Sequence, residues 1–489
     1  MNYKMVFRII GKLLKIEALL LCIPLVLSFV YNEGSFLSYI IPILLLLILG
    51  SLLSSLKPKR ANIFAREGLV IVGLSWIIMS LFGCLPFIIS GFLPNFFDAF
   101  FETVSGFTTT GASVITNIDS WYNRAKSLLF WRSFTHWIGG MGVLVFIIAI
   151  LPKSDGQTIF ILRAESPGPQ VGKLVSKIRL TARILYLIYL GLTILMAIIL
   201  SLDPNMPIFD AVVHAIGTAG TGGFGIRGES VGYYSNYVQI VVTVFMFIFS
   251  INFNLFFLLL IGKIKQVIKS EELWWFMSIV LVAVTIITVD IYNDTNLMYN
   301  TIGGALKDSF FQVGTILSTS GFSNTDFSLW SPASQTVLFL LMFVGGCAGS
   351  TAGGLKISRI AILFKSLKRE INRLIHPNSV AHIKFEGANL DGAIVYGVAR
   401  YFALLMVLFA FFVLIVSFNG FDLVTNITAV SACINNVGPG LGNVVGPMGS
   451  FASFNYFTKL MLSLAMLIGR LEIYPMLILF LPKAWSNKN

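Results

Sequence analysis

The sequence predicts an all-α integral membrane protein, and two observations carry that prediction. Hydrophobic residues make up 56% of the 489 residues and charged residues only 11%, whereas about a quarter of the residues in a soluble domain are charged. Apolar stretches of roughly 20 residues, the length that crosses about 30 Å of hydrocarbon, recur along the whole chain. This composition excludes the soluble classes of protein.

Ten membrane crossings are expected. The first follows Lys4, Arg8, Lys12 and Lys15, a basic start that is also typical of a signal peptide. Its apolar stretch is too long for such a peptide, and the following VYNEGSF offers no small-residue cleavage site, so we expect a crossing there. The ten stretches are 9–31, 35–56, 68–91, 127–151, 180–201, 235–262, 273–291, 333–372, 395–418 and 455–482.

Lysine and arginine gather in alternate connections between these crossings, at residues 57–66, 153–183, 263–269 and 356–384. Basic side chains in short loops mark the cytoplasmic side, so we expect both termini in the cytoplasm. The other connections carry acidic side chains such as Asp98, Asp210 and Asp308. These connections then face outward, where they would concentrate cations. The net charge of +12 therefore indicates membrane orientation, and no nucleic-acid partner is expected.

Residues for enzymatic chemistry are missing from the sequence. Cys22, Cys84, Cys347 and Cys433 lie scattered in apolar segments, which is typical of small buried residues. The four histidines are too dispersed to indicate a metal site. Because no Walker loop, nucleophile elbow or HExxH motif occurs, we expect neither an enzyme nor a covalent cofactor.

Four stretches on the expected outer side share one register. Each combines an amphipathic segment with a glycine-containing polar run, as in FDAFFETVSGFTTTGAS. A separation of 13 residues joins an acid to a glycine in three stretches, and Thr425 takes the place of the acid in the fourth. The aligned pairs are Asp98 and Gly111, Asp210 and Gly223, Asp308 and Gly321, and Thr425 and Gly438.

The separation indicates a half-membrane helix followed by a returning non-helical strand. Roughly ten helical residues rise about 15 Å, half the hydrocarbon thickness. Asp98, Asp210, Asp308 and Thr425 are expected to cap the helix N-termini. Irregular backbone at that depth requires surrounding protein or a watery cavity. Four such loops around one axis predict a pore.

The residues around each aligned glycine predict a potassium filter. They offer hydroxyls, one amide and backbone carbonyls, with no carboxylate or base. Neutral oxygens replace the water shell of K⁺, and the TVGYG filter of potassium channels also places a threonine two residues before its first glycine. Ordinary turns are the alternative for any single run, but four runs in one register favour the filter. The predicted filter residues are Thr109, Thr110, Gly111, Ala112, Thr221, Gly222, Gly223, Phe224, Thr319, Ser320, Gly321, Phe322, Asn436, Val437, Gly438 and Pro439.

The fourth run makes this filter asymmetric. Asn436, Val437 and Pro439 stand where the other runs have hydroxyls or small and aromatic residues. We therefore expect fewer well-formed sites and weaker discrimination of K⁺ over Na⁺ than in a channel with four identical runs.

The stretch GGCAGSTAGG interrupts the eighth crossing. Five glycines in ten positions break a helix, although a close helix-packing face of small residues is an alternative. We expect an unwound loop at 345–356, below the filter, that gates the path. Its predicted gating residues are Gly345, Gly346, Gly349, Gly353, Gly354 and Lys356.

Arg470 and Glu472 lie near the middle of the last crossing. Intramembrane charges are costly and face a cavity or a partner. We expect Arg470 to line the path, where its charge lowers cation flux; the alternative is a salt bridge to a neighbouring helix. Arg132 is expected to anchor at the membrane interface, and Glu102 and His136 to support the first run from behind.

Four sequence motifs resemble the Trk/Ktr/HKT superfamily of K⁺ transporters: SGFTTTGAS, WRSFTHWIGGMGVLVFIIAILP, GGCAGSTAGGLK and NVGPGLG. The likeness covers nearly the whole chain. It implies ten transmembrane helices, with four pseudo-fourfold M1–pore helix–M2 repeats around one central pore. Two extra crossings before residue 60 resemble the bacterial TrkH branch. The expected divisions are an N-terminal two-helix domain at 1–62 and repeats at 63–160, 161–270, 271–385 and 386–489.

The resemblance implies K⁺ uptake across a bacterial inner membrane by a homodimer with one pore per protomer. It also implies a cytoplasmic TrkA-type partner with RCK domains, through which ATP, ADP or NAD would act. An alternative is a secondary cation symporter coupled to H⁺ or Na⁺, which binds its substrate between broken helices. Such carriers more often show inverted halves, whereas these four runs all lie on one side.

Overall fold

The computed structural model describes residues 1–58, 64–142, 178–294, 299, 301–378 and 382–486. Within these ranges the chain is almost entirely helical, which confirms the predicted class. The sheet found there is one antiparallel pair, β1 (Lys384–Phe385) and β2 (Ala388–Asn389). Two-residue strands are too short to show a periodic pattern, so the sequence did not predict them.

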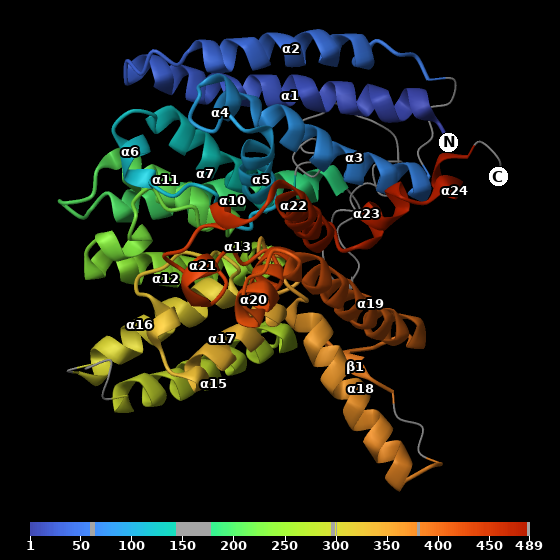
Figure 1. Ribbon diagram of the computed structural model, residues 1–489. Coiled ribbons are helices and arrows are strands. Elements are labelled where there is room, and N and C mark those ends of the chain that lie inside the picture. Colours follow the sequence, from blue (N-terminus) through green and yellow to red (C-terminus); the bar gives the residue numbers. More distant parts are fainter. Residues whose placement is uncertain (59–63, 143–177, 295–298, 300, 379–381, 487–489) are drawn as a thin grey trace.

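The helices follow the predicted crossings in chain order (Figure 1). The first part of the chain contains α1 (Tyr3–Val30), α2 (Leu37–Ser54), α3 (Ala65–Gly83), α4 (Leu85–Ile89), α5 (Phe96–Phe107), α6 (Ile118–Tyr122) and α7 (Lys126–Gly140). The second contains α10 (Ile178–Leu200), α11 (Ile208–Gly220), η1 (Ser230–Tyr233), α12 (Asn236–Ser250), α13 (Phe253–Leu260) and α14 (Ile264–Ile268). The third contains α15 (Glu271–Asn293), α16 (Ile302–Leu317), η2 (Phe327–Leu329), α17 (Pro332–Val344) and α18 (Ile357–Ile375). The last contains α19 (Gly392–Ser417), α20 (Leu423–Ile434), α21 (Gly442–Val445), η3 (Phe451–Ser453), α22 (Tyr456–Arg470), α23 (Tyr474–Leu479) and α24 (Pro482–Trp485).

Six described helices are long and apolar enough to cross a membrane, and a seventh span results if α12 and α13, bent by 92°, count as one. The expected crossing at 127–151 lies partly outside the described residues. The eighth expected crossing is interrupted at 345–356, between α17 and α18, where an unwound loop was expected. The last crossing was expected to be continuous but is broken at 471–473, between α22 and α23. Ten crossings and the four repeat boundaries therefore remain predictions.

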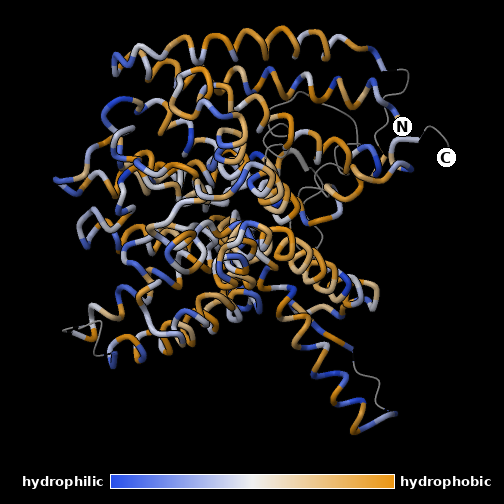
Figure 2. Tube along the Cα trace, viewed as in Figure 1, coloured by the Kyte–Doolittle hydropathy of each residue, from blue (hydrophilic) through white to orange (hydrophobic). Residues whose placement is uncertain are grey.

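Helices α1 and α2 form an antiparallel hairpin along one flank of the molecule (Figure 1). Helix α1 packs against α3 and α7, while α2 is hydrophobic along most of its length (Figure 2). The two chain ends meet, because the amino group of Met1 donates to the Ser486 carbonyl at 3.4 Å and Tyr3 stacks on Trp485. The start of the chain and the last described residues thus lie side by side, and the cytoplasmic location of the termini remains a prediction.

Four shorter helices, α5, α11, α16 and α20, precede the four aligned glycines. They contain 12, 13, 16 and 12 residues, close to the half-membrane length expected. Three of them pack against a helix from the preceding part of the chain: α11 against α7, α16 against α12, and α20 against α17. The first, α5, packs against α22 from the last part. The last of these contacts joins the end of the chain to its beginning and closes a ring.

The predicted helix caps are wrong. Asp98, Asp210 and Thr425 are the third residues of their helices, and Asp308 is the seventh of α16. The capping side chains belong to Asn95, Thr301 and Asp422, whereas Pro207 precedes α11 without a side-chain cap. The Thr425 hydroxyl and N–H donate to Asp422 and lower the pKa of its carboxyl. Three of the four helices begin before the aligned residue because a short polar side chain upstream already accepts from one of their free N–H groups.

Candidate ion pathway

The four aligned glycines lie against one another in a closed ring. At each one, a Cβ atom would meet the carbonyl oxygen that precedes the glycine of the next run. The distances would be 2.3 Å from Gly111 to Gly222, 1.7 Å from Gly223 to Ser320, 2.4 Å from Gly321 to Val437 and 2.7 Å from Gly438 to Thr110. Since real Cβ contacts are longer than 3.0 Å, only glycine fits at these four positions. The predicted filter residues are thereby brought together.

The backbone repeats its conformation around this ring. Two residues before the glycine, φ is 55° at Thr109, Thr221 and Thr319 and 57° at Asn436. The left-handed region is uncommon for residues with a side chain and costly for β-branched ones. The glycines themselves have φ values of 82°, 64°, 80° and 108° in chain order. Four runs with different sequences therefore hold one unusual shape.

The side chains two residues before the aligned glycines differ in their hydrogen-bond partners. Thr221 donates to the Gly220 carbonyl at 2.6 Å, and Thr319 accepts from the Gly353 N–H at 2.6 Å. The Asn436 amide donates to the Thr110 hydroxyl at 3.0 Å. The buried Thr109 hydroxyl and Asn436 carbonyl oxygens have no hydrogen-bond partner within the described structure.

A cavity of about 110 Å³ lies next to the ring, and all four aligned glycines line it. Ala112, Phe224 and Pro439 also line it, together with Arg132 and Arg227. Among the described residues, no aspartate or glutamate lines this cavity.

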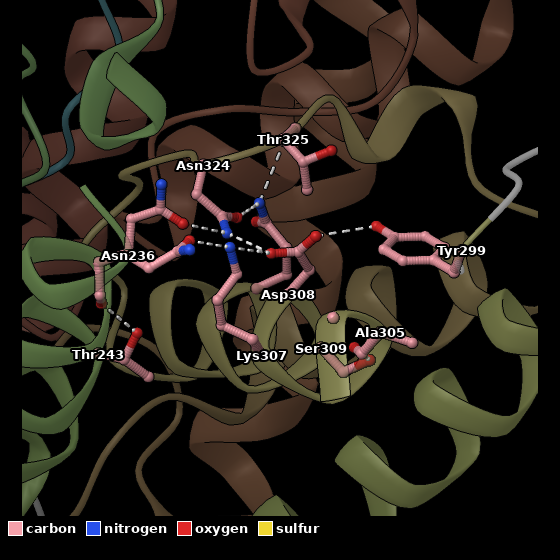
Figure 3. Close-up of polar contacts among 12 residues, drawn as sticks. Asn236, Thr243, Tyr299, Ala305, Lys307, Asp308, Ser309, Asn324 and Thr325 are labelled. Carbon is pink, nitrogen blue, oxygen red and sulfur yellow. Dashed lines mark hydrogen bonds and ion pairs between the residues drawn. The ribbon is translucent and has the colours of Figure 1, made fainter. Parts of the chain in front are cut away.

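The aligned carboxylates are occupied by other side chains. Asp98 accepts from Lys459 at 2.6 Å, and Asp210 accepts from the hydroxyls of Tyr122 and Tyr234 at 2.7 Å each. In Figure 3, Asp308 lies between Tyr299 and Asn324, which donate to it at 3.0 and 2.8 Å. Each of these three carboxylates therefore accepts from side chains outside its own helix, and the attraction of cations by the outer loops remains a prediction.

Glu102 and Arg132 form a buried ion pair behind the first two runs, with 2.5 Å between Oε1 and Nε. Glu102 also accepts from the N–H of Val114 at 2.9 Å and the hydroxyl of Ser113 at 3.0 Å. Arg132 reaches the second run, donating to the Gly225 carbonyl at 2.9 Å, and its guanidinium lies 3.5 Å from the ring centre of Phe224. The prediction that Arg132 anchors the chain at the membrane interface is wrong, because this residue is only 4% exposed.

His136 supports the second run as well as the first. Its Nδ1 lies 2.7 Å from the Gly106 carbonyl, and its ring centre lies 4.1 Å from that of Phe224. A Cβ on Gly222 would lie 2.1 Å from His136 Cγ. The imidazole therefore leaves no space for a side chain at Gly222.

Two further residues that support the third run were not predicted from the sequence. Gln312 donates to the Asn324 side chain at 3.0 Å and the Thr325 carbonyl at 3.3 Å, and His214 stacks on Phe322 with 5.7 Å between ring centres. Both lie four residues after the aligned acid, as Glu102 does. A polar residue at this offset in three of the four stretches was the signal that could have identified them.

Loop 345–356 lies directly against the ring. The Gly353 N–H donates to Thr319, and the Gly354 N–H donates to the Asn435 carbonyl at 3.1 Å. A Cβ on Gly353 would lie 2.6 Å from Asn435 O, and one on Gly345 would lie 2.2 Å from Gly353 O. Gly346 packs against the Ser250 carbonyl, and Gly349 lies beside Asn252 at the bend between α12 and α13. The glycines let the loop fold tightly under the third and fourth runs.

Arg470 connects loop 345–356 to the end of α7. Its guanidinium donates to the carbonyls of Thr351, Gly139 and Gly140, each at 2.7 Å. Lys356 is buried and donates to the Ala352 carbonyl. Glu472, close by, pairs with Arg359 at 2.5 Å. The predicted gating residues therefore meet in one place, on the far side of the ring from the cavity that the glycines line.

These observations define a class: a helical membrane protein in which four short helices and their loops enclose one axis. The chain belongs to the TrkH family of cation transport proteins, whose family model matches residues 38–489. The resemblance seen in the sequence is thereby confirmed at the level of this family.

Named relatives match the chain over its whole length. It is 36% identical over 493 residues to the Trk system potassium uptake protein TrkH of Salmonella typhimurium, with all of both chains covered. It is 34% identical over 495 residues to TrkG of Escherichia coli, with 99% of each covered. The crystal structure of the potassium transporter TrkH from Vibrio parahaemolyticus matches with a TM-score of 0.89 at 33% identity, covering 99% of this chain and all of that one.

Proposed function

We propose that this protein takes up K⁺ across a bacterial inner membrane through a gated pore. The observation that supports it most is the closed ring of four glycines, each against the carbonyl of the next run, beside a cavity that all four line. In this proposal the ring is a selectivity filter whose neutral oxygens replace the hydration shell of K⁺. The relatives, whose names describe potassium uptake, support K⁺ as the ion.

The architecture that goes with this function has ten crossings and four pseudo-fourfold repeats after the N-terminal hairpin. Contacts between consecutive parts of the chain, closed by α22 on α5, support it. A homodimer, a cytoplasmic TrkA-type partner that binds the nucleotide, and cytoplasmic termini belong to the same proposal. The name "Trk system" carried by the relatives supports the existence of a partner.

Loop 345–356 is the proposed gate. It lies against Thr319 and Asn435, and Arg470 fixes it to α7. Displacing the loop would open the inner side of the filter, and a fixed positive charge beside it would oppose cation passage. Lys356, buried at the lower end of the loop, adds a second positive charge.

Growth of cells that lack K⁺ uptake tests the proposal. Wild-type protein should restore growth at limiting K⁺, whereas alanine at Gly111, Gly223, Gly321 or Gly438 should not, at equal protein levels in the membrane. Equal rescue by all four variants would show that the ring does not conduct the ion.

A further inference from the structure

One buried carboxylate accepts hydrogen bonds from loop 345–356 and from the start of α18 that follows it. Glu272, the second residue of α15, is 5% exposed. Its Oε1 accepts from the N–H of Ala348, inside the loop, at 2.7 Å. The same oxygen accepts from the N–H of Ser358, just after the loop, at 3.1 Å. A single oxygen atom on α15 therefore binds the backbone at two positions, Ala348 and Ser358.

The charge on this acceptor matters for how firmly the loop is held. Hydrogen bonds to an ionised carboxylate are roughly twice as strong as neutral ones, and a buried N–H left without a partner is costly. Other N–H groups of the loop donate to neutral oxygens, including Cys347 to the Ser250 carbonyl at 2.9 Å. Removing the Glu272 carboxylate would leave two N–H groups unsatisfied at once.

A second carboxylate caps the helix that carries Glu272. Glu386, at the turn between β1 and β2, accepts from the Ser270 hydroxyl and the Glu272 N–H, both at 2.9 Å. Its own N–H donates to Glu271 at 3.3 Å. Lys365 of α18 pairs with Glu271 and donates to the Lys384 carbonyl at 2.6 Å. The hairpin, α15 and α18 therefore meet at one junction.

The backbone at Glu386 is an independent sign of function. Its φ is 50°, and φ of the following Gly387 is 75°. A two-residue turn with both central residues in the left-handed region favours asparagine or aspartate before glycine. Glutamate is unfavourable in this position, and such strain is found where a side chain has a task. In the structure, the Glu386 side chain caps the N-terminus of α15.

We propose that Glu272 and Glu386 together form a latch on the gate, in which Glu272 holds loop 345–356 and Glu386 holds the helix that positions Glu272. Movement of the 384–389 hairpin would then loosen the loop. The inference rests on the proposed gate, and it adds the positioning residues through which the loop is released. Neither carboxylate touches the ion.

Site-resolved thiol labelling of the detergent-solubilised protein tests the latch. Cys347 lies in the loop, while Cys84 and Cys433 lie elsewhere, and all three are buried. Glu272→Ala should raise the labelling rate of Cys347 several-fold and leave Cys84 and Cys433 protected. Glu272→Gln keeps an acceptor oxygen but not its charge, so the labelling rate of Cys347 should lie between those of Glu272→Ala and the wild type. Unchanged Cys347 labelling, or an equal rise at all three cysteines, would overturn the proposal.

The contribution of Glu386 is tested without weakening its turn. Glu386→Asn suits the left-handed position better but does not reach Ser270 and Glu272, so Cys347 labelling should rise, although less than in Glu272→Ala. Glu370→Ala, at an exposed glutamate of α18 paired with Arg369, is the matched control and should change nothing. No rise in Glu386→Asn would overturn the part of the latch assigned to the hairpin.

Flux in proteoliposomes separates this inference from the proposed function. If the loop is the gate, Glu272→Ala should also raise K⁺ flux per protein, with the K⁺ to Rb⁺ ratio unchanged. Faster Cys347 labelling without higher flux would support the latch and overturn the gate. Higher flux in Arg470→Ala without any effect of Glu272→Ala would support the gate and overturn the latch.

Discussion

The ring and the loop beneath it are built in opposite ways. The ring consists of four runs with one backbone shape, in which glycines touch carbonyls and no charged atom takes part. The loop occurs once, and its contacts include a carboxylate, a guanidinium and an ammonium. The glycine–carbonyl packing of the ring leaves its backbone no alternative arrangement. The side-chain contacts of loop 345–356, in contrast, can be broken one at a time. The difference indicates that the ring is a fixed element and that loop 345–356 is an element that can be displaced.

The largest expected effect is from breaking the ring. Gly223→Ala places a methyl group 1.7 Å from the Ser320 carbonyl. Only a displacement of the filter backbone relieves a clash of this kind, so we expect K⁺ uptake to be abolished. Uptake of radioactive Rb⁺ into cells measures the loss.

Gly303→Ala is the matched control for the ring. Gly303 lies in α16, and a Cβ there would meet nothing within 4 Å. Alanine is also the better helix former, so uptake should stay at the wild-type level. Equal loss in Gly223→Ala and Gly303→Ala would contradict the account of the ring.

The next effect concerns the buried ion pair behind the ring. Arg132→Ala leaves the buried Glu102 carboxylate without its counter-charge, and breaking such a pair costs about 3–5 kcal/mol. We expect a lower Tm in detergent and a loss of uptake, because the Gly225 carbonyl loses its donor and Glu102, which holds Val114, loses its partner. Arg369→Ala, which removes an exposed pair on α18, should cost no more than about 1 kcal/mol. Wild-type uptake in Arg132→Ala would show that the first two runs do not depend on this pair.

Arg470→Ala tests whether loop 345–356 can be released. The substitution removes three hydrogen bonds to Thr351, Gly139 and Gly140, together with a positive charge near the path. K⁺ flux in proteoliposomes should rise several-fold, and the order of preference among K⁺, Rb⁺, Cs⁺ and Na⁺ should not change. Unchanged flux with lower stability would favour a purely structural role for Arg470.

The smallest effect tests the asymmetry of the filter. Asn436→Thr gives the fourth run the residue found in the other three and preserves a position where threonine already adopts φ near 55°. It also removes the amide contact to Thr110, worth about 1 kcal/mol. We expect a modest rise in the K⁺ to Na⁺ flux ratio. A fall in that ratio would show that the Asn436 amide, rather than symmetry, maintains selectivity.

The ring was predictable from the sequence because it is repeated. A single TTTG run resembles any polar turn, but four runs 13 residues from an acid or threonine defined the register before any contact was known. The helix starts were not predictable from that register, since Asn95 and Asp422 cap the helices upstream of it.

Contacts distant in sequence could not be predicted from it. Nothing near Arg132 indicates that Glu102, 30 residues earlier, will pair with it. Glu272 resembles an ordinary acid in a first helical turn, and its partners Ala348 and Ser358 lie 76 and 86 residues away. Such pairs occur once, and an unrepeated contact leaves no periodic signal in the chain.

The most direct test of the central claim is crystallographic. Crystals grown in Rb⁺ in place of K⁺, measured at the rubidium absorption edge, locate the ion by its anomalous signal. We predict a peak on the axis enclosed by residues 109–112, 221–224, 319–322 and 436–439, and its loss in Gly223→Ala. Ordered Rb⁺ elsewhere in the membrane part, with none inside the ring, would contradict the claim that the four runs carry the ion.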